Sequence, residues 1–439
     1  MSDFQHQAIR LTTQQQPLTW LESLRNSSAE NWLAQPWPTR KTEHWKYTPL
    51  QSLHKTIYQV WGTPEKSLLN TVQESFIPLD ATRLVFVDGV FDEKHSNNLP
   101  ESVVRFSQVN TAQQSLIEKH LGKIVEGERH LFATLNNAWL DDGVLIHVPR
   151  NQQLEKPVYI VNVMTGAVVS NQRVLVVLEE SSQAEIIEHY FSGENAQKGF
   201  ANSLTEIHLG DNASLHHYRL NLEEEQAQHI GAVHVDLQRN ARLRGFALAL
   251  GSSLMRIDYQ LNHRGSGAEL DLQGIYLPRN QQMVDYHTNV CHWVPHCKSN
   301  EVFRGIVSDS AQAIFNGRIY IHQDAQETLA ELSNKNLLTS NKAEVNTKPE
   351  LEIYADDVKC AHGATISQLN ANARYYLQSR GLSRAEADVM LSFGFINELL
   401  EQIQQPAVHD YLYPRLAKLF GRDESLIAAE GHLLELTDD

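Results

Sequence analysis

Residues 239–249 decide the fold class, and they read Arg-Asn-Ala-Arg-Leu-Arg-Gly-Phe-Ala-Leu-Ala. A turn-prone Arg-Asn-Ala is followed by alternation that places Leu243, Gly245 and Ala247 on one face of an expected strand. The underlying motif is a small residue, alanine, any residue and an apolar residue. It recurs at 183–186, 212–215, 240–243, 267–270 and 310–313. The alanines of the first four copies, at positions 184, 213, 241 and 268, are about 28 residues apart.

A repeat of this length, with strand patterns and no helix between its copies, is typical of stacked coils of strand. One coil cannot bury its apolar face alone, so each coil must stack on its neighbours. We therefore predict a mainly β chain with a parallel β-helix at its core. A sandwich or jelly roll is the alternative that the pattern leaves open.

Helical patterns flank this core. Near the N-terminus, Thr19-x-x-Glu22 and Ser27-x-x-Glu30 match the capping box that begins many helices. Near the C-terminus, Ser383-x-x-Glu386 precedes a helical pattern whose apolar surface is broad, which indicates burial against this chain alone or against a partner as well. We expect an N-terminal helical region at 1–80, a β-helix core at 81–370 with helical insertions near 111–140, and a C-terminal helical domain at 371–439.

The start of the core carries a hairpin signal. Residues 84–91 read Leu-Val-Phe-Val-Asp-Gly-Val-Phe, two short strand patterns around Asp-Gly. Asp-Gly favours a type I′ turn because both positions need positive φ. We therefore predict a β-hairpin here.

Bulk composition excludes several classes of protein. The formal net charge is -16, which argues against nucleic acid as the main partner. Apolar runs such as 174–178 are far shorter than the roughly 20 residues that span a bilayer. The first residues lack the basic and apolar segments of a secretory signal, and three cysteines are too few for a disulfide framework. We expect a cytoplasmic protein with no membrane partner.

Two groups of residues carry ligand types for zinc or iron. The first contains His287, Cys291, His292, His296 and Cys297. Their spacing matches no known metal motif, and strand alternation predicts that His287 and Cys291 share a face with Cys297 but not with the other two histidines. The competing interpretation is that these side chains are packed or hydrogen-bonded within the sheet.

The second group is Cys360 and His362, which lie two residues apart and therefore share a face of a strand. A thiolate and a neutral imidazole suit a soft metal. Two ligands make an incomplete site, so a partner chain would have to complete it. A buried thiol beside a surface histidine is the structural alternative.

No phosphate-binding loop, nucleophile elbow or paired Cys-x-x-Cys motif is present, so nucleotide chemistry would have to come from another chain. A carbohydrate-acting β-helix enzyme is a second hypothesis, since Asp356 and Asp357 are adjacent acids. Neighbours in a strand point to opposite faces, however, which is poor geometry for an acid/base pair. We expect the chain not to be an enzyme.

Several longer runs resemble the SufB/SufD family of iron–sulfur cluster assembly proteins. They are residues 45–48 (Trp-Lys-Tyr-Thr), 300–309, 315–317, 336–338, 343–365 and 375–381. Within the family, the Cys-x-His-Gly-Ala-Thr form at 360–365 resembles the SufD branch, whereas SufB typically has Ser-His-Glu-Ala. The chain also has Asn334 where SufB places a cysteine before its Leu-Leu pair.

The resemblance implies a right-handed parallel β-helix between helical regions and a role as a non-catalytic scaffold. It implies pairing with a SufB subunit through the β-helix and docking of the ATPase SufC on the C-terminal helices. It also points to Cys360 and His362 as residues that hold transient iron or a nascent cluster at the partner interface, with no intrinsic cofactor. Two copies of this chain would supply four such ligands, so a homodimer with its own site is the alternative.

Overall fold

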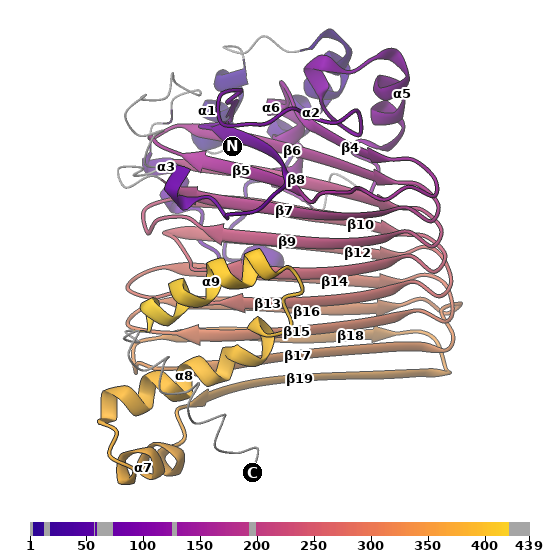
Figure 1. Cartoon of the computed structure of the whole chain (residues 1–439). Coiled ribbons are helices and arrows are strands. Elements are labelled where there is room, and N and C mark those ends of the chain that lie inside the picture. Colours follow the sequence, from indigo (N-terminus) through magenta and orange to yellow (C-terminus); the bar gives the residue numbers. More distant parts are fainter. Residues whose placement is uncertain are drawn as a thin grey trace.

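The main body of the molecule is a parallel β-helix of two long sheets that face each other across an apolar lumen (Figure 1). This confirms the predicted β-helix over the sandwich alternative. The computed structural model describes residues 3–12, 18–56, 58, 73–124, 130–192 and 199–420. Residues 421–439 of the expected C-terminal domain, and parts of the expected N-terminal region, lie outside the described residues.

The two sheets alternate along the chain, so each coil contributes one strand to each sheet. The ten-stranded sheet contains, in spatial order, β2 (Val90–Phe91), β1 (Thr82–Val87), β5 (Val158–Met164), β7 (Gln183–Ser192), β9 (Ser214–Leu222), β11 (Arg242–Ala249), β13 (Glu269–Tyr276), β15 (Lys298–Val307), β17 (Thr328–Leu338) and β19 (Val358–Gln368). The nine-stranded sheet contains β3 (Val103–Arg105), β4 (Val144–Val148), β6 (Val169–Leu178), β8 (Phe200–Leu209), β10 (Gln228–Leu237), β12 (Leu254–His263), β14 (Met283–His292), β16 (Gln312–Ile321) and β18 (Glu344–Ile353).

The repeat motif forms the corner between coils. Asn212 and Asn240 adopt left-handed φ values of 56° and 54°, which asparagine tolerates better than most residues. The alanines that follow them, Ala213 and Ala241, are fully buried in the lumen core. Leu243 then lies in register with Leu215 and Leu270 of the adjacent coils. The spacing of the motif therefore sets the stacking register.

The local signals at the ends of the core are confirmed in part. β1 and β2 pair antiparallel around Asp88 and Gly89, whose φ values of 51° and 83° fit the predicted type I′ turn. Ser383 and Glu386 form the predicted capping box of α8 (Arg384–Leu400). The prediction of capping boxes at Thr19 and Ser27 was wrong. Thr19 is the first residue of a short 3-10 helix whose N-cap is Leu18, so its side chain caps nothing. Ser27 lies inside α2 (Glu22–Ala34), which begins five residues earlier.

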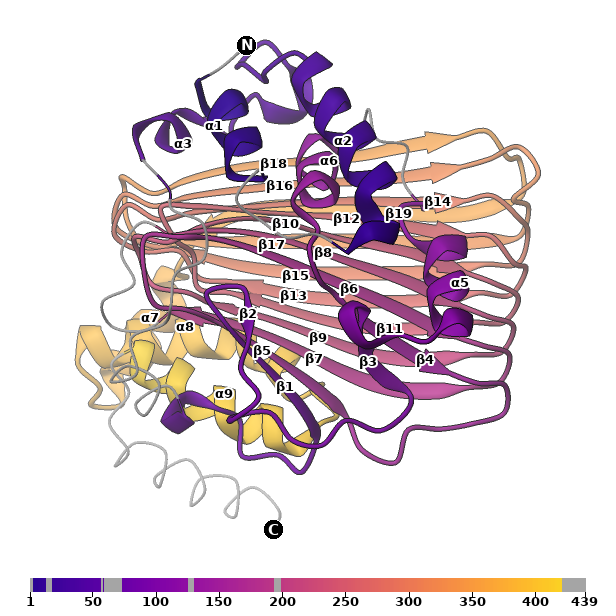
Figure 2. The same cartoon turned by 90° about the horizontal axis from the view of Figure 1, so that it is seen from above.

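Helices cover the outer faces of both sheets (Figure 2). The N-terminal and inserted helices pack on the nine-stranded sheet, and the C-terminal helices pack on the ten-stranded sheet. None of the described helices is long and apolar enough to cross a membrane. The helices are α1 (Asp3–Thr12), α2 (Glu22–Ala34), α3 (Gln51–Lys55), α5 (Thr111–His120), α6 (Leu131–Trp139), α7 (Ala371–Ser379), α8 (Arg384–Leu400) and α9 (Pro406–Leu419).

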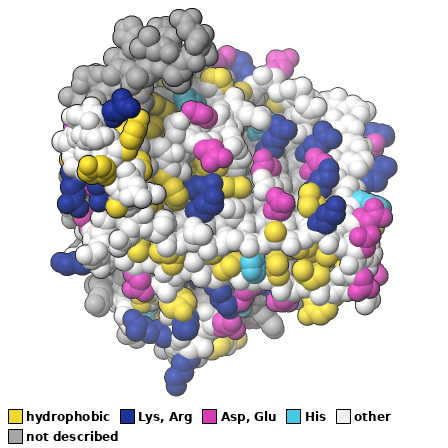
Figure 3. All heavy atoms as spheres, turned by 90° about the horizontal axis from the view of Figure 1, so that it is seen from below, with side chains coloured by type: hydrophobic (Ala, Val, Ile, Leu, Met, Phe, Trp, Pro, Cys, Tyr) yellow, Lys and Arg dark blue, Asp and Glu magenta, His cyan; other side chains and the backbone are white. Residues whose placement is uncertain are grey.

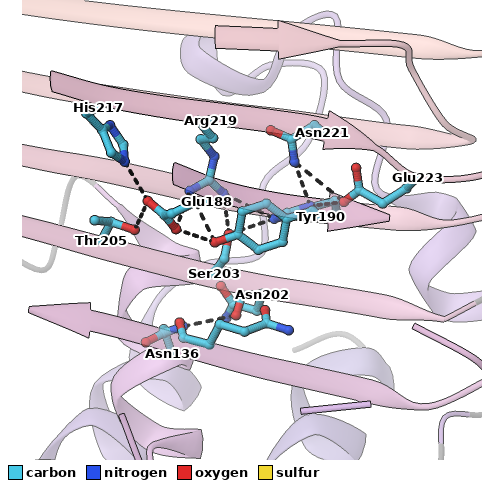
Figure 4. A network of polar contacts seen from close by, with 12 residues as sticks. Asn136, Glu188, Tyr190, Asn202, Ser203, Thr205, His217, Arg219, Asn221 and Glu223 are labelled. Carbon is cyan, nitrogen blue, oxygen red and sulfur yellow. Dashed lines mark hydrogen bonds and ion pairs between the residues drawn. The ribbon is translucent and has the colours of Figure 1, made fainter. Parts of the chain in front are cut away.

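Part of the lumen is polar rather than apolar (Figure 4). The Glu188 carboxylate accepts hydrogen bonds from His217 at 2.7 Å and Thr205 at 2.8 Å, and it lies 3.3 Å from the guanidinium of Arg219. Glu188 and Arg219 are both fully buried. Burial alone would raise the pKa of Glu188, but the charge of Arg219 and the hydrogen bond from His217 lower it to about 2. The ion pair is therefore charged at neutral pH.

Replacing Arg219 with methionine leaves the Glu188 carboxylate buried without its main counter-charge. We expect the free energy of unfolding of R219M to fall by about 3–5 kcal/mol, measured by urea denaturation. Arg239→Met is the control. It breaks an ion pair with Asp211 whose side chains are 60% and 37% exposed, so we expect a loss of about 1 kcal/mol or less. The double variant E188Q/R219M should recover part of the loss; equal stability of R219M and R239M would contradict this account.

Candidate functional site at the last coil

The last coil of the β-helix is paired with another coil on one side only. β18 pairs only with β16 and β19 only with β17 among the described strands, so each leaves one edge of backbone N–H and C=O groups free of strand partners. Figure 3 views the molecule from this end and shows a band of hydrophobic side chains bordered by charged ones. Long flat edges of this kind readily add another strand, and soluble proteins normally protect them.

Cys360 and His362 lie on the lumen side of this last coil. In β19, Cys360 is in register with Ala330 and His362 with Leu332, and both partners belong to the lumen core. The prediction that the two side chains share one face is therefore confirmed. Cys360 is half-buried against the core, whereas His362 is exposed. Burial raises the pKa of the Cys360 thiol, so the thiol stays protonated until a metal or a base removes its proton.

The groups around this pair do not complete a metal site. Thr347 of β18 also lies on the lumen side, but its hydroxyl donates to Asn334 at 2.8 Å. Asn334 in turn donates to the Tyr276 hydroxyl at 2.8 Å, so these polar groups satisfy one another. No cluster of three or more His, Cys, Asp or Glu suited to a metal ion occurs within the part of the chain that the structure describes. The last coil thus presents two soft ligands and an open side.

A buried acid lies below this pair in the lumen, and the sequence reasoning missed it. Glu301 of β15 is in register with Leu332, which is in register with His362, so the three occupy one row of the lumen. Two strand spacings separate the backbones of Glu301 and His362, about 10 Å. Both Glu301 carboxyl oxygens are buried and lack a hydrogen-bond partner. The available signal was the alternation of residues 301–307, which places Glu301 on the same face as buried Phe303.

The described structure does not bring the histidine- and cysteine-rich stretch at 287–297 together as a cluster of metal ligands. His287 and Cys291 point away from the lumen, toward Asp285 and Gln260, whereas Cys297 is fully buried in the lumen core. The prediction that Cys297 shares their face was wrong, because the turn between β14 and β15 breaks the alternation. Exposed His296 sits in this turn and pairs with a glutamate 3.2 Å away.

His292 is buried and stacks on His263, with ring centroids 4.1 Å apart and planes only 19° apart. Ring nitrogens of stacked imidazoles direct their lone pairs in parallel planes, so the two rings cannot converge on one ion. The interpretation of this stretch as packed and hydrogen-bonded side chains is therefore favoured. Asp356 and Asp357, the paired acids of the enzyme hypothesis, both lie exposed in the turn between β18 and β19 rather than in a groove.

Comparison with known proteins follows the same division of the chain. Residues 160–395 match the SUF system FeS cluster assembly, SufBD core domain, and residues 3–160 match the SufBD protein N-terminal region. The chain belongs to the SufBD family. The core match covers the β-helix from β5 to β19 and includes Cys360 and His362.

Curated relatives cover most of the chain. The chain is 32% identical to the iron-sulfur cluster assembly SufBD family protein slr0076 of Synechocystis, over 83% of this chain and 84% of the relative. It is 30% identical to the iron-sulfur cluster assembly protein SufD of Escherichia coli, over 87% and 89%. SufD of Bacillus subtilis is 27% identical over 88% and 90%. The resemblance to the SufD branch and to iron–sulfur cluster assembly is therefore confirmed.

The burial of Glu301 leads to a testable prediction about how the free energy of unfolding depends on pH. Burial raises its pKa from 4.5 to about 7, although the Thr288 hydroxyl opposes the shift. The folded state holds the Glu301 proton more tightly than the unfolded state does. The protonated carboxyl therefore contributes its full share to the free energy of unfolding below pH 4.5, and this contribution is lost as pH rises through 7. We expect Glu301→Gln to be more stable than the wild type by up to about 3 kcal/mol at pH 8, with little difference at pH 4.5.

Denaturant unfolding across this pH range measures the effect. Glu331→Gln is the control, because it changes an exposed carboxylate on neighbouring β17 and should keep the wild-type dependence on pH. Parallel pH dependences for the wild type and E301Q would show that Glu301 does not hold its proton at neutral pH.

Proposed function

We propose that the chain is a non-catalytic scaffold subunit of an iron–sulfur cluster assembly complex. In this proposal it pairs with a SufB-type subunit through the open end of its β-helix and docks a SufC-type ATPase through its C-terminal helices. Iron or a nascent cluster is the cargo, held at the subunit interface by Cys360 and His362. The observation that carries the proposal is an incomplete metal-ligand set, two soft ligands, on a last coil that has a strand neighbour on one side only.

The free edges of β18 and β19 support a strand-adding partner. Backbone hydrogen bonds to an added strand supply affinity, and exposed apolar side chains supply specificity. Ile353 and Ile366 of the last coil are 40% and 47% exposed, which is unfavourable unless a partner covers them. A partner that pairs here would place its own side chains beside Cys360 and His362, where the missing ligands are needed.

The C-terminal helices support a second contact. α8 buries Phe393, Ile396 and Leu400 against the ten-stranded sheet, so its broad apolar surface is largely used within this chain. α7 instead has no buried residue, and its Tyr375 and Tyr376 are 75% and 56% exposed. Exposed tyrosines are frequent anchors of protein interfaces. Because the chain has no nucleotide-binding motif, ATP hydrolysis in the docked subunit would supply the work of opening or assembling the shared site.

The ligand assignment is tested in the assembled complex. We expect the variant with both Cys360→Ala and His362→Ala to retain its partners but to lose most bound iron and acid-labile sulfide after cluster assembly, because the soft ligands of this chain are gone. His296→Ala, an exposed histidine with an ion-pair partner, is the control and should load like the wild type. Full loading and a full assembly rate in the double variant would refute the assignment. Stoichiometric iron in a dimer of this chain alone would favour the homodimer instead.

The docking assignment is tested with the α7 tyrosines. We expect Tyr375→Ala combined with Tyr376→Ala to weaken binding of the ATPase by roughly tenfold or more, since two exposed aromatic anchors are removed. Binding of the SufB-type subunit should not change. Isothermal titration calorimetry against each purified partner measures both affinities. Unchanged affinity for the ATPase would place its docking site elsewhere.

A further inference from the structure

A series of side chains in mutual contact follows one corner of the β-helix toward its open end. The guanidinium of Arg264 lies 4.9 Å from the centroid of the Trp293 ring. Trp293 packs on Tyr320 with a centroid distance of 5.3 Å, and Tyr320 packs on Tyr354 at 5.6 Å. These four residues, which we call the corner ladder, come from consecutive coils, near β12, β14, β16 and β18. Each ring thus contacts the ladder side chain of the coil before it, with the planes of the two ring pairs tilted by 48° and 52°.

Tyr354 is the last member of the corner ladder and has no ring above it among the described residues. It directly follows β18, and its backbone N–H bonds to Ile321 of the coil below. Tyr320 covers one side of its ring, yet the side chain is 61% exposed. Neighbouring Ile353 is also exposed. The side of the ring away from Tyr320 therefore faces the direction in which a further coil would stack.

We propose that Tyr354 anchors the interface by stacking against an aromatic ring or guanidinium on the end coil of a second β-helix subunit. This inference rests on the proposed function and identifies which side chain contributes most to that pairing. The kind of partner is inferred from the free strand edges that lie beside Tyr354. The free edges of β18 and β19 lie on the sides of these strands away from β16 and β17, and Tyr354 directly follows β18. A strand that pairs with the β18 edge would therefore bring a corner residue to about one strand spacing from the backbone of Tyr354. That distance, about 4.8 Å, is close to the ring spacing within the corner ladder.

The chemistry of the position favours a flat or cationic partner group. Within the corner ladder, rings are contacted by other rings and by arginines, including Arg318, whose guanidinium lies 5.1 Å from the Tyr320 ring. Arg318 is held there by Glu352, with hydrogen bonds of 2.6 and 2.7 Å. Aromatic and guanidinium groups are also the side chains that most often dominate binding energy at interfaces.

The experiment measures the affinity of the full chain for the purified SufB-type subunit of the same organism by isothermal titration calorimetry. We expect Tyr354→Ala to weaken binding by about tenfold or more, and Tyr354→Phe to bind within about twofold of the wild type, because the ring rather than the hydroxyl makes the contact. Tyr375→Ala is the control, since it removes another exposed tyrosine, one on α7 that this account assigns to the ATPase and not to the SufB-type subunit. Thermal melting should show that Y354A is folded, because its side chain is mostly exposed.

Each outcome has a distinct meaning. Wild-type affinity in folded Y354A would overturn the anchor assignment and leave the proposed pairing intact. Equal losses in Y354A and Y354F would overturn the stacking contact. A wild-type chain that does not bind the SufB-type subunit would overturn the proposed function itself. Self-association of the wild type that Y354A abolishes, without any SufB-type binding, would identify a second copy of this chain as the occupant and contradict the proposal.

Discussion

Coil-on-coil stacking is the constraint on which the rest of this structure depends. Each strand satisfies its backbone groups and buries its lumen side chains only against the strands before and after it. At the first coils, short antiparallel strands provide that cover: β2 pairs with β1 in one sheet, and β3 pairs with β4 in the other. At the last coil, β18 and β19 have a neighbour on one side only. The molecule is therefore complete at one end and open at the other, and the ligand pair lies at the open end.

The lumen shows that stacking accommodates polar groups where they are paired. Glu188 and Arg219 sit in the interior because neighbouring coils bring their charges together with His217 and Thr205. Glu301 is a different case, because no cation forms an ion pair with it among the described residues, and the Thr288 hydroxyl only partly opposes the effect of burial. Burial raises the pKa of this carboxyl to about 7, so the lumen disfavours negative charge in the row that contains His362.

Local sequence signals predicted the coils, but they did not predict which side chains of different coils contact one another. The alanine motif revealed the repeat because an alanine is buried in the core at the same place in each of these coils. The two-residue spacing of Cys360 and His362 placed them correctly on one face. Strand alternation predicted the wrong face for Cys297, because a turn separates it from Cys291 and the sequence did not show how long that turn is. The Glu188–Arg219 pair and the corner ladder were not predicted, because they depend on the register of several coils, which sums the lengths of all intervening turns. Whether Cys360 and His362 hold iron or a cluster stays a prediction.

Hydrogen–deuterium exchange of the backbone, with and without the purified SufB-type subunit, tests the central claim most directly. Edge N–H groups without a strand partner exchange quickly, and pairing with a partner strand protects them. The account predicts that β18 and β19 gain strong protection on binding, while the inner coils change little. Binding that protects another surface and leaves both edge strands in fast exchange would contradict it.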